Sequence, residues 1–118
     1  MQAHGLGLFT AALGLGEPWW VSGAEFVEDT GRLDLQVDYP RGARFSCPEP
    51  GCEQDRCPVH DIHDKTWRHL DFFQHKAFLH ARVPRVRCPE HGVRLVSVPW
   101  ARPGSGFTML FEALVLTF

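Results

Sequence analysis

Cysteine and histidine residues occur in close pairs along this sequence, and such pairs are typical ligands of zinc. Cys88-Pro-Glu-His91 is followed by Gly92, the pattern of a zinc knuckle, in which a tight turn directs two side chains to one point. Cys47 and Cys52 form a second pair, and their four-residue gap is within the range found in zinc sites. We predict that these four side chains bind one structural zinc ion, because thiolate and imidazole suit zinc better than hard cations. A complete set of four protein ligands leaves no open position for a catalytic water.

A third pair, Cys57-Pro-Val-His60, supplies more ligands than one site needs. Cys57 and His60 are therefore reserve ligands, which could replace Cys47 and Cys52, bind a second metal with an incomplete set, or have only a local role. Nucleophilic catalysis by Cys57 is the weaker alternative, because the sequence shows no oxyanion-hole loop or substrate pocket.

The elements that position the ligands are expected to be strands. Leu33, Leu35 and Val37 alternate with polar residues, the pattern of a half-buried strand. Together with the turn residues Asp29-Thr30-Gly31, this pattern predicts an antiparallel hairpin over about 21–39.

A second hairpin is predicted over 67–87, with its turn at 74–76, since Pro84 opposes a helix through this stretch. Alternation returns at 93–98. Residues 46–64 show no periodicity, and we expect the metal to order them. The fold class is a small, mostly β, zinc-ribbon-like domain of antiparallel hairpins.

Helices are predicted only near the two ends. Residues 9–13 favour a short N-terminal helix, 101–106 read as a linker, and Thr108 is a suitable cap for a helix running to Phe118. This C-terminal helix is almost entirely apolar, so we expect it to self-associate or to begin a further domain that is cut short. The predicted organisation is 1–18 lead-in, 19–100 zinc-ribbon-like domain, and 101–118 linker and truncated helix-turn-helix segment.

Charge is divided unevenly along the chain, although the formal net charge is only −2. Residues 1–64 have an acidic excess, whereas residues 65–103 have a basic excess. Arginines interleaved with aromatic residues are a footprint of nucleic-acid binding. The alternative is that they solvate one sheet face or pair with the acidic half. The candidate DNA-binding residues are Arg68, Arg82, Arg85, Arg87 and Arg94.

From the sequence we expect neither a membrane protein nor a secreted protein. No apolar run approaches the ~20 residues of a membrane span. The first residues lack the basic leader of a signal peptide. We therefore expect a cytoplasmic protein with reduced cysteines.

Four stretches of the sequence are distinctive. They are Cys-Pro-Val-His-Asp (57–61), Thr-Trp-Arg-His-Leu-Asp-Phe-Phe-Gln-His (66–75), Leu-His-Ala-Arg-Val-Pro-Arg-Val-Arg-Cys-Pro-Glu-His-Gly-Val (79–93) and Val-Pro-Trp-Ala-Arg-Pro-Gly-Ser-Gly-Phe-Thr (98–108). With these stretches, the chain resembles the N-terminal zinc-binding region of insertion-sequence transposases of the ISL-three family, from about Leu8 to the end. The resemblance implies a zinc-ribbon-like module, DNA as the partner and recognition of the terminal inverted repeats of the element.

The chain departs from the family pattern in two ways. Its first knuckle, Cys47 to Cys52, is two residues wider than the usual Cys-Pro-x-Cys-Gly, and the sequence stops at Phe118, before any ribonuclease H-like catalytic domain. We therefore expect no enzymatic activity. The alternative functions are a zinc-stabilised protein-interaction module and a transposase fragment without function.

Overall fold

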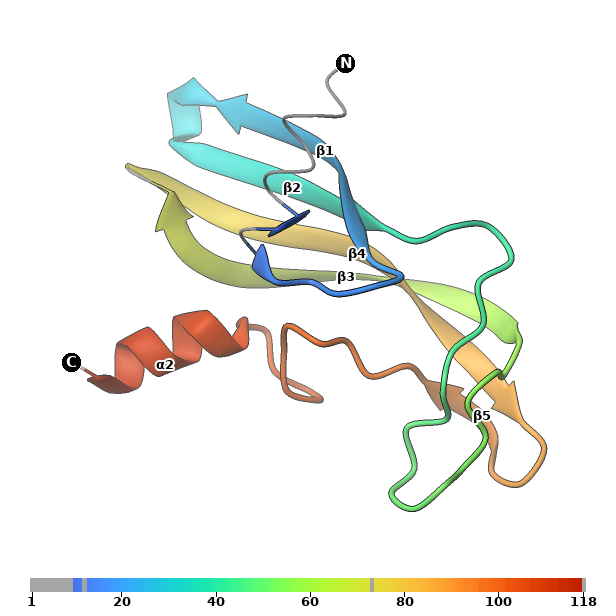
Figure 1. Ribbon diagram of the computed structural model, residues 1–118. Coiled ribbons are helices and arrows are strands. Elements are labelled where there is room, and N and C mark those ends of the chain that lie inside the picture. The colour runs from blue at the N-terminus through green and yellow to red at the C-terminus, as the bar shows by residue number, and fades with distance from the viewer. Residues whose placement is uncertain (1–9, 12, 73, 118) are drawn as a thin grey trace.

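One five-stranded β-sheet, built from two hairpins and a short fifth strand, forms the centre of the protein (Figure 1). The computed structural model describes residues 10–11, 13–72 and 74–117. Four strands lie in the order β1-β2-β4-β3, and β5 pairs with β4. The predicted fold class, mostly β with a C-terminal helix, is confirmed. The elements are β1 (Trp20–Val27), the 3-10 turn η1 (Glu28–Thr30), β2 (Arg32–Asp38), β3 (Val59–Phe72), β4 (His75–Cys88), β5 (Gly92–Leu95) and α2 (Met109–Thr117).

The first hairpin agrees with the prediction from alternation. β1 and β2 pair antiparallel, from Trp20 opposite Asp38 to Val27 opposite Arg32. The turn between them ends at Gly31, whose φ of 63° lies in the left-handed region that glycine adopts without steric cost.

The second hairpin joins β3 and β4 and is longer than the sequence predicted. The strand alternative to a helix is confirmed, and β4 runs through Pro84 to Cys88. β3 begins at Val59, inside the 46–64 stretch that shows no periodicity. The predicted start of the hairpin at residue 67 was therefore wrong. The reason is exposure: most side chains of 59–64 are exposed, and this end of β3 is held by its pairing with β4 rather than by an apolar face.

Parallel pairing of β2 with β4 unites the two hairpins in one sheet. Leu35 lies opposite Leu79, and Val37 lies opposite Ala81. All four side chains are buried, so the two strands give the core one continuous apolar surface. Local alternation could identify each strand, but it could not identify this long-range pairing.

Aromatic side chains from the segments outside the sheet complete the core. The ring of Trp100 makes edge-to-face contacts with Trp19, at 5.0 Å between centroids, and with Trp67 of β3, at 5.3 Å. Trp19 also contacts Phe45, at 5.7 Å, so the core reaches the segment that carries the first cysteine pair.

The C-terminal segment runs beside β3 before it enters α2. The N–H of Arg68 donates to Gly106, and the N–H of Thr108 donates back to Arg68. Thr108 caps α2 as predicted, because its hydroxyl accepts a hydrogen bond from the N–H of Phe111 at 3.2 Å. No helix in the described parts of the chain is long and apolar enough to cross a membrane. Self-association through α2 stays a prediction.

The predicted N-terminal helix is described only in part. Thr10, Ala11 and Leu13 are helical, whereas Phe9 and Ala12 lie outside the described residues. The predicted division at 18 and 100 also stays a prediction.

Candidate metal centre

The first cysteine pair is closed by a tight turn that accounts for its wider spacing. The N–H of Cys52 donates to the carbonyl of Glu49 at 3.1 Å across Pro50 and Gly51, and Gly51 has a φ of 83°. Proline followed by a glycine at positive φ is the signature of a type II turn. The extra residues therefore form a turn that brings Cys52 back toward Cys47.

The second pair lies at the tip of the hairpin between β4 and β5. Cys88 is the last residue of β4 and pairs with Gly92, the first residue of β5, whose φ is 77°. The N–H of Glu90 donates to the Cys88 sulfur at 3.4 Å. The loop thus folds around the sulfur and turns His91 toward it.

The predicted ligand atoms of Cys47, Cys52, Cys88 and His91 all lie within 4.8 Å of one another. Nδ1 of His91 is 3.7 Å from the sulfurs of both Cys47 and Cys88, and the sulfurs of Cys52 and Cys88 are also 3.7 Å apart. Two sulfurs that each lie ~2.3 Å from a tetrahedral zinc are separated by about 3.8 Å. The donor set therefore fits zinc in both chemistry and spacing.

The electrostatics of the cluster favour a bound cation. Burial opposes ionisation of Cys88, but the N–H of Glu90 and the contact with His91 lower the pKa of its thiol to about 6. The N–H of Gln54 favours the Cys52 thiolate, yet burial and the neighbouring sulfurs of Cys88 and Cys47 raise its pKa to about 11. One thiolate thus hinders formation of the next, and a divalent cation removes this conflict because it stabilises both.

Residues 43–91, which span both knuckles, match the family model described as the zinc-finger of transposase IS204/IS1001/IS1096/IS1165. This region is a zinc ribbon of the ISL-three transposase type. The ribbon holds structural zinc, and the clustered side chains described above supply a complete donor set for it.

Two curated relatives resemble nearly the whole chain. Both are described as the transposase for insertion sequence element IS1557, from Mycobacterium tuberculosis strains CDC 1551 / Oshkosh and ATCC 25618 / H37Rv. Each is 35% identical over 115 residues, which cover 92% of this chain and 25% of the relative. The chain therefore spans about a quarter of the length of these relatives. No solved structure matches the chain.

Cys57 and His60, the reserve ligands, have different environments in the zinc ribbon. Cys57 is buried beside the cluster, and its S–H donates to the carbonyl of Gln54 at 3.9 Å. Burial and the nearby Cys88 sulfur raise the pKa of the Cys57 thiol, so it stays protonated as a neutral donor. His60 is exposed, and its Nδ1 lies 3.0 Å from the guanidinium of Arg87. Neither residue is among the clustered donors.

Three of the five candidate DNA-binding arginines form ion pairs within the chain. Arg85 makes a two-pronged contact with Asp61, and Arg94 Nε donates to Glu49 at 2.7 Å. The pKa of each carboxyl is held below its ordinary value by its arginine.

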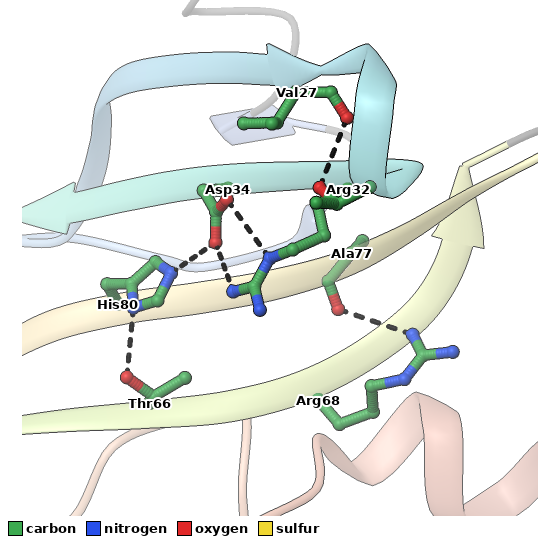
Figure 2. A network of polar contacts seen from close by, with 8 residues as sticks. Val27, Arg32, Asp34, Thr66, Arg68, Ala77 and His80 are labelled. Atoms are coloured by element: carbon green, nitrogen blue, oxygen red, sulfur yellow. Dashed lines mark hydrogen bonds and ion pairs between the residues drawn. The ribbon is translucent and has the colours of Figure 1, made fainter.

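Arg68 is the third paired arginine. Its guanidinium donates to Asp71 at 2.6 Å. It also donates to the carbonyl of Ala77 at 3.3 Å (Figure 2). These contacts hold Arg68 between the strands of the second hairpin, so much of its hydrogen-bonding capacity is used within the fold.

Arg82 and Arg87 differ from the other three. Both are exposed, and within the described ranges neither forms an ion pair with a carboxylate. Their positive charges are therefore not offset by a described carboxylate.

Two supports of the zinc ribbon were not predicted from the sequence. Gln54 Nε2 donates to Glu90 at 3.0 Å and so joins the two knuckle loops. Phe45 pairs with Cys57 as an isolated antiparallel bridge, which fixes the strand entering the first knuckle. The available signal was the apolar Phe45 two residues before Cys47, but nothing local identified its partner.

Proposed function

We propose that this chain is the zinc-stabilised DNA-binding module of an insertion-sequence transposase and that it recognises the terminal inverted repeats of the element. Cys47, Cys52, Cys88 and His91 bind the zinc, which has a structural role. The observation that carries the proposal is that Arg82 and Arg87, on a zinc ribbon of transposase type, are exposed and form no ion pair with a described carboxylate. Guanidinium groups bind phosphates in a two-pronged geometry, which makes the DNA backbone a suitable partner.

The role assigned to these residues is binding rather than catalysis. A zinc with four protein ligands has no position for water or substrate, so it organises the fold and does not activate a nucleophile. DNA cleavage would then require parts of a transposase that this chain does not match. None of the four cysteines forms a disulfide, which suits a reducing compartment such as the cytoplasm.

A second candidate is a protein-interaction module with an acidic partner. It is favoured by the ion pairs of Arg68, Arg85 and Arg94, which show that arginines of this chain already bind carboxylates. The two candidates differ in the anion that they require. Phosphates lie at close, regular intervals along DNA, and their condensed counterions are released on binding.

A salt series tests the proposal. Zinc-loaded protein is titrated against a labelled duplex that contains an inverted repeat of the element and against a shuffled duplex of equal length, with fluorescence anisotropy as the readout. We expect preference for the repeat and an affinity that falls steeply with salt, with a log–log slope of about −0.9 per phosphate contacted. No binding to either duplex at low salt would contradict the DNA-binding function. Equal affinity for both would contradict recognition of the repeat.

A further inference from the structure

A groove of about 680 Å³ lies on the surface and is lined in part by the zinc-ribbon region. Its walls come from the start of β1, the segment that follows β2, the start of β3 and the middle of β4. Figure 1 shows the segment after β2 leaving the sheet and descending beside the beginning of β3. The residues used below are Trp20, Tyr39, Arg41, Arg44, Ile62 and Arg82.

The groove is strongly basic because its arginines are not neutralised. Within the described part of the chain, Arg41, Arg44 and Arg82 form no ion pair. Among the lining residues, the one carboxylate is Asp38, and it accepts a hydrogen bond from the backbone N–H of Tyr39 at 2.8 Å. The lining therefore contains three guanidinium groups and one carboxylate, a net positive charge that suits a polyanion.

The basic side chains are carried by a preorganised backbone. The N–H of Ala43 donates to Pro40 at 3.1 Å, and Gly42 has a φ of 84°, so Arg41 occupies the second position of a type II turn. Arg44 is held in turn by a hydrogen bond from its guanidinium to the carbonyl of Arg56 at 3.2 Å. Little ordering of this segment is then needed when a ligand binds.

The floor of the groove combines a rigid aromatic ring with exposed apolar side chains. Tyr39 makes edge-to-face contacts with Trp19, at 5.3 Å, and with Phe45, at 5.2 Å. Trp20 and Ile62 are 39% and 38% exposed, so both offer apolar surface to a ligand in the groove. Such surface is suited to the deoxyribose edge of a DNA backbone, which is apolar between its phosphates.

We propose that this groove binds the phosphodiester backbone of duplex DNA, with Arg41, Arg44 and Arg82 on phosphates and Trp20 and Ile62 against the sugars. The proposal rests on the DNA-binding function proposed above and moves the contact from the predicted arginine series to a different surface. Of the five predicted arginines, Arg82 alone lines the groove. Arg41 and Arg44 lie in the acidic half of the sequence, where net charge concealed them.

A pair of charge-matched variants tests the groove. Arg41→Ala/Arg82→Ala removes two groove charges, and Lys76→Ala/Arg102→Ala removes two charges from residues that do not line it. Binding of both variants and the wild type to the same duplex is measured over a salt series. For the groove variant we expect an affinity at least about tenfold weaker and a log–log salt slope less steep by about 1.8, the value for two lost phosphate contacts. The control should stay within about twofold of wild type.

Each outcome bears on a different claim. Equal weakening of the two double variants, or an unchanged groove variant, would overturn the groove while DNA binding stands. A wild type that binds an acidic peptide but no DNA would overturn both proposals. Zinc content and thermal melting confirm folding of each variant. If Arg41→Ala/Arg82→Ala fails to fold, the single variant Arg41→Gln, at a surface turn, should weaken binding up to about tenfold, and unchanged binding would overturn the groove.

Discussion

The backbones of Phe45 and Cys57 exchange two hydrogen bonds, with N···O distances of 3.1 and 2.8 Å. Cys47, a proposed zinc ligand, follows Phe45 by two residues, and Arg44, a groove residue, directly precedes it. The same bridge therefore fixes the backbone that leads into the first knuckle and the backbone of one groove residue. The proposed metal centre and the basic groove therefore share one short segment of backbone.

Substitution of individual cysteines identifies the zinc ligands. We expect Cys88→Ser to lower zinc affinity by more than about 100-fold, beyond the 10–100-fold typical of residues that only support a ligand, because a neutral hydroxyl replaces a thiolate. Cys57→Ser should retain one zinc per chain, since its thiol donates to Gln54 and lies outside the donor set. Native mass spectrometry measures both. Loss of zinc from Cys57→Ser with retention in Cys88→Ser would contradict the assignment.

Asp34 is the centre of a polar network on the sheet (Figure 2). Its carboxylate accepts hydrogen bonds from Arg32, at 2.7 Å, and from His80, at 2.6 Å, and its side chain is only 16% exposed. We expect Asp34→Asn to destabilise the protein by about 1.5–3 kcal/mol at pH 7, the range for hydrogen bonds to charged groups. Asp71→Asn is the control, because Asp71 makes one ion pair and is 53% exposed. Urea denaturation measures both.

The effect of Asp34 should depend on pH with a definite sign. Arg32 and, to a smaller extent, His80 hold the pKa of Asp34 below its ordinary value of 3.8, against the effect of burial. The stabilisation is therefore full well above pH 3.8 and is lost as the pH falls below that value. A wild-type advantage over Asp34→Asn that grew on acidification would refute this linkage.

His69 should make the fold more sensitive to mild acid. Burial, assisted by the charge of Arg68, lowers the pKa of His69 below its ordinary 6.5. Because the unfolded chain binds this proton more tightly, the stability contribution is full above pH 6.5 and falls as the pH decreases toward the folded pKa. His69→Gln can still hydrogen-bond to Thr108, whose hydroxyl lies 2.7 Å from the imidazole.

Two measurements check this prediction. The NMR titration of His69 should have its midpoint below 6.5. The stability of the wild type relative to His69→Gln should decrease between pH 7.5 and 5.5, so a constant difference would argue against the buried neutral imidazole. The comparison cancels the acid-dependent loss of zinc, which both proteins share.

The sequence was most informative where chemistry or alternation was local. The spacing around Cys88 predicted the second knuckle, and the alternation of Leu33, Leu35 and Val37 predicted β2, because both patterns depend on neighbouring residues alone. The strand beginning at Val59 was missed, since it is stabilised by pairing rather than by an apolar face.

Long-range relations were beyond prediction for the same physical reason. The parallel pairing of Leu35 with Leu79 joins residues far apart in the chain, and no local pattern records it. The ion pair of Arg85 with Asp61 likewise depends on the register of two strands. Counting charge along the sequence could not distinguish such a paired arginine from an unpaired one such as Arg41.

In the proposed function, zinc bound by the two knuckles organises a DNA-binding surface. The most direct test measures affinity for the terminal-repeat duplex before chelation, after removal of zinc, and after zinc is restored. We predict that chelation abolishes binding and that one equivalent of zinc recovers it, because the ligand Cys47 and the groove residue Arg44 lie on one short segment that pairs with Cys57. A zinc-free chain that binds the duplex as tightly as the loaded protein would contradict the account.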